Sequence, residues 1–447
     1  MYLPFCLPFV AVLAAGAAAF AADGAVVEVS SLAELAQAAA KSGQQVKMKP
    51  GIYKLTDFIS LAAAAERRKR QEWHDLIFSG NDNHFDLRGV TLELDTAIRE
   101  KLHAPMHTDE FVVTGSHVTL EGLTITCVGD GKADHGAVLG ITGSSATLRD
   151  CTVHVQGSAP YGYGDLFGKG GLKHCGVHIT GSGARILGCK VFNKSFGHGF
   201  YLQEDCNDVR FEDCYVEGVM RSTDDILKET SGLAVNRKFR MEMKNRNGEP
   251  LIVPGYMKAL SEDGFRTYGT HQNVVLKNCT AKHMRGGFEL RTKSAPRLEN
   301  CTALGCERGF WVSDGAVVTN CRGEAKYGPL LYVEGDKARV DVELLPAEDD
   351  KVHVHALAAI YGKDNEVTIT AKQPRAHPLP ILIGFGPPGM GENMAPHSEK
   401  RTQGLVLNNQ TAMPLVIGAG ASKCRLVTEG SLLENKGKDI EVLKARP

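Results

Sequence analysis

The fold is decided by a repeat that begins VTLEGLTI (118–125), ATLRDCTV (146–153), ARILGCKV (184–191) and VRFEDCYV (209–216). It continues as VVLKNCTA (274–281), PRLENCTA (296–303) and VVTNCRGE (317–324). Each segment is a short strand, a Gly, Asp or Asn, usually a Cys, and a second strand. Gly, Asn and Asp tolerate the left-handed conformation that bends one strand into the next. The repeat therefore predicts a solenoid in which each coil pairs with its neighbours, with insertions where the spacing is long.

A second motif recurs about half a coil later, as DHGAVLG (134–140), GHGFYLQ (197–203), EDGFRTY (262–268), RGGFELR (285–291) and ERGFWVS (307–313). Gly opens each strand, and apolar residues then alternate with variable ones. Because side chains alternate between the two faces of a strand, we expect the Phe and Leu positions to point inward. The intervening positions then form an outer face.

The two motifs together resemble the right-handed parallel β-helix of the pectin lyase-like superfamily, from about Ala25 to at least Cys321. The resemblance implies one all-β domain over residues 22–447. An amphipathic helix within 30–55, with Ser30 or Ser31 as N-cap, is expected to cover the open end of the solenoid. Two insertions are expected: a charged helix and loop at about 57–85, and strand-like runs around the turn NRNGEP at about 230–261.

Composition and the start of the chain bear on location and partners. The 447 residues carry 51 basic and 52 acidic side chains, a balance that argues against a nucleic-acid partner. Residues 1–21 are apolar and end in small residues, which predicts a cleaved signal peptide and a secreted or periplasmic protein of the bacterial cell envelope. No later segment predicts stable membrane insertion.

Cysteine is frequent for an exported protein, with 12 residues. Six occupy the same place in the repeat, and parallel coils stack such a column every ~4.8 Å. We therefore predict a column of buried free thiols. Strained disulfides between neighbouring coils are the alternative. No CxxC pair is present, and we predict no metal site of Cys and His.

The outer face of the Gly-opened strands carries side chains suited to binding acidic sugars, because aromatic rings stack on sugars and guanidinium groups pair with carboxylates. The candidates for substrate binding are His178, Tyr201, Gln203, Tyr268, Arg308 and Trp311. The candidates for catalysis are His198, Asp224, Asp225, Asp263, Arg266, Glu289 and Arg291. A structural alternative is that Arg266 and Glu289 only brace neighbouring coils.

Some of these residues are reminiscent of the polygalacturonase-type members of the superfamily. The Gly-His-Gly around His198, the pair Asp224-Asp225 and the triplet Arg291-Thr292-Lys293 resemble their paired Asp, His and basic elements. The His precedes the Asp pair instead of following it, and the Asn-Thr-Asp element is missing. The roles of the family's residues therefore do not transfer as a set.

Two reactions on an acidic polysaccharide or oligosaccharide remain open. Hydrolysis needs two carboxylates across a sugar, for which the candidates are Asp224, Asp225, Asp263 and Glu289. Elimination needs a base, for which the candidates are His198, Tyr268 and Arg291, and a cation that neutralises a uronate carboxylate, either Arg266 or a bound Ca²⁺. A non-catalytic glycan-binding or cell-envelope structural protein is the alternative to both reactions.

Overall fold

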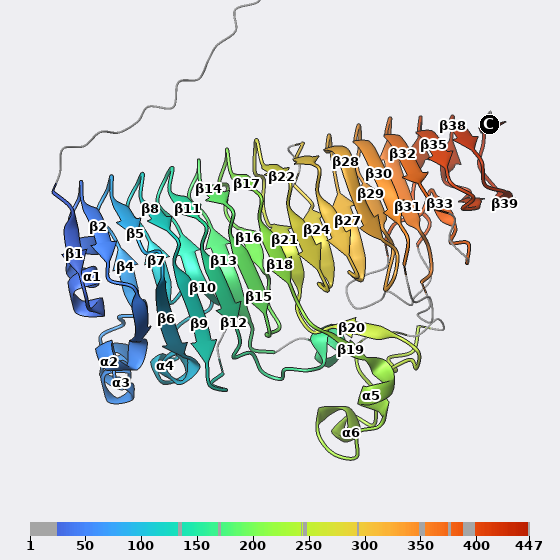
Figure 1. The fold of residues 1–447 in the computed structure, drawn as a ribbon. Coiled ribbons are helices and arrows are strands. Elements are labelled where there is room, and N and C mark those ends of the chain that lie inside the picture. Colours follow the sequence, from blue (N-terminus) through green and yellow to red (C-terminus); the bar gives the residue numbers. More distant parts are fainter. Residues whose placement is uncertain are drawn as a thin grey trace, which may run out of the picture.

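The computed structural model describes residues 25–132, 136–168, 171–242, 244, 248–292, 295–347, 354–373, 377–387 and 398–445. The predicted signal peptide, residues 1–21, lies outside these ranges. The chain winds into a right-handed parallel β-helix whose coils follow one another from the N-terminal to the C-terminal end (Figure 1). The predicted fold is thereby confirmed. Within the described ranges, no helix is both long and apolar enough to cross a membrane.

One sheet is built from the Gly-opened strands, and we call it the site sheet. Its strands pair in parallel from coil to coil. In chain order they are β4 (Leu76–Phe78), β7 (Phe111–Val113), β10 (Gly136–Ile141), β13 (His174–Ile179), β16 (Phe200–Leu202), β21 (Asp263–Thr267), β24 (Gly286–Leu290), β27 (Arg308–Val312), β29 (Leu331–Glu334), β31 (Ala358–Lys363), β33 (Ile381–Ile383), β36 (Leu415–Ile417) and β39 (Leu432–Asn435). The short β34 (Thr402–Gln403) and β37 (Ala421–Ser422) pair beside it.

The second, larger sheet holds the Cys-containing repeat, which supplies two strands to most coils. Its N-terminal strands are β1 (Val27–Val29), β2 (Gln45–Met48), β3 (Gly51–Lys54), β5 (His84–Asp86) and β6 (Val90–Asp95). The repeat itself forms β8 (Thr119–Glu121), β9 (Thr124–Val128), β11 (Thr147–Arg149), β12 (Thr152–Val155), β14 (Arg185–Leu187), β15 (Lys190–Asn193), β17 (Arg210–Glu212), β18 (Tyr215–Glu217), β22 (Val275–Lys277), β23 (Thr280–Lys282), β25 (Arg297–Glu299), β26 (Thr302–Leu304) and β28 (Val317–Glu324). The less regular C-terminal repeats also form coils, through β30 (Arg339–Leu345), β32 (Glu366–Ala371), β35 (Val406–Gln410), β38 (Arg425–Thr428) and β40 (Glu441–Lys444).

The turn before each Cys has the left-handed backbone that the sequence predicts. The φ angle is 52° at Asp150, 64° at Gly188 and 54° at Asn278. The following cysteines point into the core and are free thiols, as are the other described cysteines. The sulfur of Cys214 lies 3.2 Å from the Ile186 carbonyl oxygen on the preceding coil. The column therefore fills the inner corner of the solenoid without disulfides.

The opening Gly of the second motif is required by close packing at the other corner. A Cβ atom at Gly199 would lie 2.4 Å from the side chain of Val216, and one at Gly264 would lie 2.8 Å from the Gly287 carbonyl oxygen. The next residue then points into the core. Phe265, Phe288 and their equivalents stack in parallel, with 5.0 Å between those two ring centroids. This stack fixes the register of the site sheet, so the residues between the phenylalanines face outward.

The N-terminal helices partly match the prediction. Helix α1 (Leu32–Ala39) begins after Ser31, whose side chain accepts a hydrogen bond from the Glu34 amide, and buries one face in the core. Its role as a cap of the solenoid stays a prediction. The insertion expected at 57–85 is shorter. Helices α2 (Leu55–Phe58) and α3 (Leu61–Lys69) form it, whereas 76–78 and 84–86 are already strands of the two sheets. Helix α4 (Thr96–Leu102) packs against α3.

The second insertion starts earlier than predicted and is mostly not β-structure. We call residues 219–260 the arm. Its base is an antiparallel ribbon of β19 (Met220–Ser222) and β20 (Met257–Ala259), so the paired strands enclose the whole excursion instead of flanking NRNGEP. Beyond the ribbon lie α5 (Thr223–Leu227) and α6 (Leu233–Asn236), which project from the stack of coils (Figure 1). A small apolar core of its own holds the arm together with the 3₁₀ turn η1 (Gly164–Phe167).

Candidate functional site

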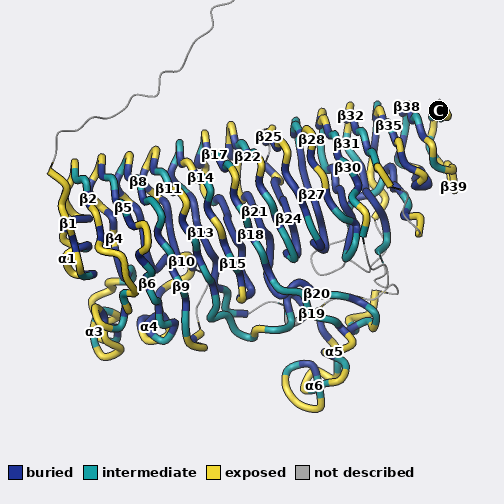
Figure 2. The backbone as a smooth tube through the Cα atoms, in the orientation of Figure 1, coloured by how far each residue is buried: buried dark blue, intermediate teal, exposed yellow. Residues whose placement is uncertain are grey.

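The outer face of the site sheet, which the sequence predicts to bind acidic sugars, is largely buried along its central strands. Strands β21, β24 and β27 are buried along their whole length (Figure 2). Trp311 is only 4 % exposed and Tyr201 only 2 %. The arm explains part of this burial, because Lys258 of β20 reaches Glu307, the residue before β27, with an Nζ–Oε2 distance of 2.8 Å.

Charged side chains on this face form a compact ionic layer. Arg285 donates hydrogen bonds to both carboxylate oxygens of Asp263, at 3.0 and 3.1 Å. Arg266 and Arg308 both pair with Glu289, the latter with an Nη1–Oε1 distance of 3.0 Å. The parallel register places Arg266 opposite Glu289, as the repeat predicts. Together these ion pairs join three successive coils.

Because they are held in the ionic layer, Asp263 and Glu289 do not serve as a general acid or a general base. Burial alone would raise the pKa of Asp263, but Arg285 and Arg266 outweigh it and hold the pKa well below its usual range. Glu289 is 2 % exposed and clamped between two arginines. Neither carboxyl group is placed to donate a proton to a glycosidic oxygen, which inverting or retaining hydrolysis requires.

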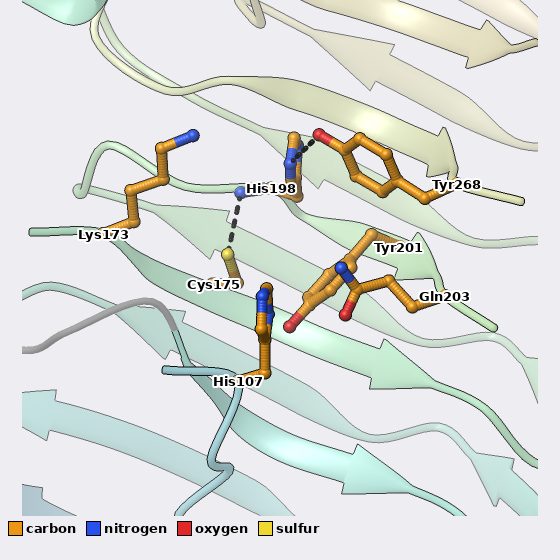
Figure 3. Close-up of a pocket in the computed structure, with 7 residues that line it drawn as sticks. All are labelled: His107, Lys173, Cys175, His198, Tyr201, Gln203 and Tyr268. Atoms are coloured by element: carbon orange, nitrogen blue, oxygen red, sulfur yellow. Dashed lines mark hydrogen bonds between the residues drawn. The ribbon is translucent and has the colours of Figure 1, made fainter. Parts of the chain in front are cut away.

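A small open pocket adjoins the ionic layer, with a volume of about 210 Å³ (Figure 3). Its floor is made by buried side chains, and its rim by exposed or half-buried ones. The lining residues are His107, Lys173, Cys175, His198, Tyr201, Gln203 and Tyr268. Four of them, Tyr201, Gln203, His198 and Tyr268, are predicted site residues.

A histidine–tyrosine pair forms one wall of this pocket. The Tyr268 hydroxyl lies 2.9 Å from His198 Nε2, and the two rings meet edge to face (Figure 3). On the other side of the imidazole, Nδ1 lies 3.4 Å from an Asp263 carboxylate oxygen. The Asp263 backbone N–H also donates to Nδ1 at 3.4 Å, and Nε2 lies 3.4 Å from a Glu262 carboxylate oxygen, so both ring nitrogens face a carboxylate and the ring can bind the Tyr268 hydroxyl in either tautomer. The histidine and the tyrosine therefore form one hydrogen-bonded unit on the wall of the pocket.

The environment sets the protonation of both groups. Burial lowers the pKa of His198 to about 4, although Glu262 and Asp263 oppose the shift. Burial raises the pKa of Tyr268 above its usual range. At neutral pH the imidazole is thus neutral and the phenol keeps its proton. These are the states that a general base and a general acid need before reaction.

Lys173 is the cation of the pocket lining. Its Nζ lies 2.6 Å from one oxygen of Glu262, whose other oxygen is 3.4 Å from His198 Nε2. Burial would raise the pKa of Glu262, but the facing His198, Lys173 and Arg285 side chains reverse the effect and lower that pKa. At neutral pH Lys173 and Arg285 carry the positive charge beside this carboxylate. The Lys173 side chain is about a quarter exposed and lines the pocket.

A second histidine is anchored behind the pocket. His178 Nδ1 lies 3.0 Å from Asp109 Oδ2, and Asp109 Oδ1 also accepts the Ala137 amide at 3.0 Å. The imidazole stacks on Tyr201 with 4.5 Å between ring centroids. His178 therefore supports Tyr201 from behind and is not part of the lining.

The remaining predicted residues lie elsewhere. Asp224 accepts a hydrogen bond from the Gly255 amide, and Asp225 pairs with Lys228; both belong to α5 on the arm, outside the ionic layer. Arg291 pairs with Glu334 and lies over the Trp311 ring. A guanidinium in this position is a cation and not a base. The Trp311 ring is covered by Arg291 and Arg308, so it is not an open platform for a sugar.

Sequence reasoning missed several members of the site. Glu262 and Arg285 stand two positions before the Gly that opens the strand in EDGFRTY and RGGFELR, so the repeat alignment contained them. Their signal was that a charged residue recurs at this position of the motif, as Glu262, Arg285 and Glu307. Lys173 and His107 belong to loops outside the repeat, and no pattern in the sequence marks them.

The pocket contains no clear metal centre. Within the described ranges, no group of three or more His, Cys, Asp or Glu side chains is arranged to hold an ion. Each carboxylate of the ionic layer already faces a Lys or Arg side chain. These side chains therefore do not fit a Ca²⁺ ion as the cation that neutralises a uronate carboxylate. Lys173 is the cation that the pocket lining supplies instead.

No protein-family model and no curated protein sequence matches this chain. Solved structures that resemble it include the A-module of a mannuronan C-5 epimerase from Azotobacter vinelandii, at 11 % identity over 88 % of this chain and 100 % of that chain, with a TM-score of 0.39. A PL6 alginate lyase in complex with a trisaccharide has 12 % identity over 94 % and 85 %, with a TM-score of 0.43. An endo-xylogalacturonan hydrolase from Aspergillus tubingensis has 10 % identity over 79 % and 85 %, with a TM-score of 0.29. At these scores the likeness carries no residue roles, and the chemistry must come from this chain's own side chains.

Proposed function

We propose that this protein is an exported polysaccharide lyase that cleaves an acidic polysaccharide by β-elimination at the pocket of His198 and Tyr268. The observation that carries the proposal is this pair, 2.9 Å apart on one wall of an open pocket, with a neutral imidazole and a protonated phenol. Export rests on the apolar start of the sequence.

Elimination from a uronate needs removal of the hydrogen on C5, next to the carboxylate. In the tautomer with hydrogen on Nδ1, His198 Nε2 takes this proton, the C5–H electron pair becomes the C4–C5 double bond, and the C4–O bond to the leaving sugar breaks. Tyr268 donates its proton to the departing oxygen. The hydrogen bond between the two side chains then returns the proton from His198 to Tyr268, which restores the starting state.

The carboxylate must be neutralised before its α-hydrogen becomes acidic enough to remove. Lys173 is placed for this task, because its ammonium group lies at the pocket and shares Glu262 with His198. A preorganised cation in a partly dry site stabilises the charge that develops on the carboxylate. The Tyr201 side chain and Gln203 complete the lining on which the sugar rests.

Hydrolysis is less well supported, because the carboxyl groups nearest to the pocket are ion-paired. A non-catalytic glycan-binding protein remains the competing account, since it needs the same pocket without a reactive pair.

The experiment is product analysis on a panel of uronic-acid and sulfated glycans. We expect reducing ends to appear together with the ultraviolet absorbance of an unsaturated uronate. The variant His198→Gln should abolish both signals, whereas His84→Gln, which changes a partly exposed histidine on β5, should retain them. Reducing ends without the absorbance would overturn the proposal in favour of hydrolysis. Glycan binding without any product would overturn it in favour of a binding protein.

A further inference from the structure

A buried lysine at the base of the arm contacts two carboxyl groups from distant parts of the chain. Lys258 lies on β20, and its Nζ is 2.5 Å from Asp165 Oδ1 and 2.8 Å from Glu307 Oε2. Asp165 belongs to η1, whereas Glu307 directly precedes β27 on the site sheet. A primary amine and a carboxyl group are thus held in contact by three separate segments, next to a second carboxyl group.

Burial removes water from this contact. The side chains of Lys258 and Glu307 are 1 % exposed, and that of Asp165 is 9 % exposed. Burial would lower the pKa of Lys258, but Asp165 and Glu307 outweigh it and raise the pKa, so the resting state is an ion pair. Transfer of one proton from Lys258 to Asp165 gives an uncharged amine and an uncharged acid without any uptake or release of protons. A water-free site favours such neutralisation, because unsolvated charges are costly.

Glu307 is fixed beside the lysine nitrogen. Its Oε1 accepts a hydrogen bond from the Ala259 amide at 2.5 Å, and its Oε2 accepts one from Lys258. Burial raises the pKa of Glu307 above its usual range, although Lys258 opposes the shift. A protonated carboxyl group can give a proton through one oxygen and accept another through the second. Glu307 is therefore placed to carry protons to and from the lysine nitrogen.

We propose that Lys258 and Asp165 form an intramolecular amide bond, with Glu307 as the proton carrier. Lys258 Nζ, after giving one proton to Asp165, attacks Asp165 Cγ; the N–C bond forms and one Cγ–O bond breaks. Glu307 moves a proton from the nitrogen to the departing hydroxyl group, which leaves as water. An ammonium and a carboxylate thus become one amide and one water molecule, with no oxidant or cofactor. Arg285 and Arg308 act electrostatically on Asp165 and stabilise the negative charge that develops on its oxygen during the attack.

Preorganisation drives this condensation forward. Two groups that are held in contact react as if at effective concentrations of up to about 10⁵–10⁸ M, and burial keeps away the water that would reverse the reaction. The bond closes a covalent ring through η1 and the arm. All described cysteines are free thiols, so this link is also one that a reducing agent does not break. It holds the arm against the site sheet and does not depend on the reaction proposed at the pocket.

The test is the mass of the intact, denatured protein, followed by a tryptic peptide map. The wild-type mass should be one water molecule, about 18 Da, below the mass calculated for the purified chain. The map should contain a branched peptide that joins the segment of Asp165 to that of Lys258. Trypsin should not cleave after Lys258, because the acylated side chain has no positive charge. Asp165→Ala should restore the calculated mass and the cleavage.

Two further variants separate the bond from a simple ion pair. Glu307→Gln keeps the size of the side chain but cannot carry the proton in the same way, so the folded variant should retain the full mass. Glu229→Gln is the matched control, because Glu229 of the arm accepts a hydrogen bond from the Tyr163 hydroxyl at 2.8 Å, just before η1, outside the Lys258 cluster. This variant should lose one water molecule as the wild-type protein does.

The wild-type protein alone can overturn the proposal, so the test does not depend on the folding of a variant. An intact mass equal to the calculated one, or a linear peptide that ends at Lys258 in place of the branched one, would refute the bond. Loss of water that maps to a succinimide at an Asp-Gly step would refute it as well, although the intact mass is the same. A Glu307→Gln protein that still forms the bond would overturn the role of Glu307.

Discussion

Replacing Tyr268 by Phe removes one oxygen atom and tests the reaction directly. The lost hydroxyl is the group 2.9 Å from His198 Nε2, while the ring keeps its place 4.5 Å from the Arg266 guanidinium. General acid catalysis by a positioned side chain typically contributes 10²–10⁴-fold, so we expect kcat to fall by about that factor, or roughly 3–5 kcal/mol in activation free energy. KM should change little, because the ring still lines the pocket.

The assay is the initial rate of ultraviolet absorbance increase on the polysaccharide that the wild-type protein cleaves. Folding should be nearly unaffected, since Tyr268 is 36 % exposed and one such hydrogen bond contributes about 1 kcal/mol or less. Tyr215→Phe is the matched control, because it removes a hydroxyl that donates to Glu217 at 2.7 Å on the larger sheet. A Tyr268→Phe protein that keeps more than half of the wild-type kcat, or that changes only KM, would refute the assigned role.

Four further results are expected. The kcat/KM of the wild-type protein should fall as the pH drops towards about 4, because His198 then gains a proton and ceases to be a base; a flat acid limb would contradict this. Glu289→Gln should destabilise the fold by about 3–5 kcal/mol in denaturant titrations, because two buried arginines lose their partner, whereas the exposed Asp225→Asn should stay within ~0.5 kcal/mol. Burial, together with the Glu110 carboxylate, raises the pKa of Asp75 from 3.8 to about 8. The stability that the protonated carboxyl contributes is therefore complete below pH 3.8 and is lost as the pH rises through about 8. Asp75→Asn should flatten the fall in unfolding free energy between these two pH values. Phe288→Ala should cost about 3–5 kcal/mol, measured by the same titrations, since it opens the phenylalanine stack on both sides.

The sequence was sufficient to predict the coils, because each coil repeats the same physical requirements. A left-handed turn needs Asn, Asp or Gly, the inner corner needs a small buried side chain, and the other corner excludes a Cβ atom. The alignment of repeats is also the register of the sheet, which is why the contact between Arg266 and Glu289 followed from spacing alone. The predicted boundaries of the insertions were less accurate, because a strand such as β4 does not contain the sequence motif that marks the repeated strands.

The state of the site could not be predicted in the same way. Whether an outward side chain is exposed depends on segments that cover it, and the arm and η1 come from parts of the chain with no repeat. Asp165 of η1 reaches Lys258 of the arm, with 2.5 Å between Oδ1 and Nζ, over the same corner as Glu307. These long-range contacts turn a row of charged residues into a closed ionic layer beside the open pocket.

The burial of that ionic layer also determines how the protein should respond to ionic strength. Salt screens charges that face water over a Debye length of about 8 Å at physiological concentration, and it screens buried pairs much less. Added salt should therefore leave the ion pairs around Asp263 and Glu289 intact while it weakens the attraction between Lys173 and an anionic chain. The charges that stabilise the fold are thus buried, whereas those that attract the substrate are exposed. A saline medium should therefore slow substrate binding without lowering the stability of the fold.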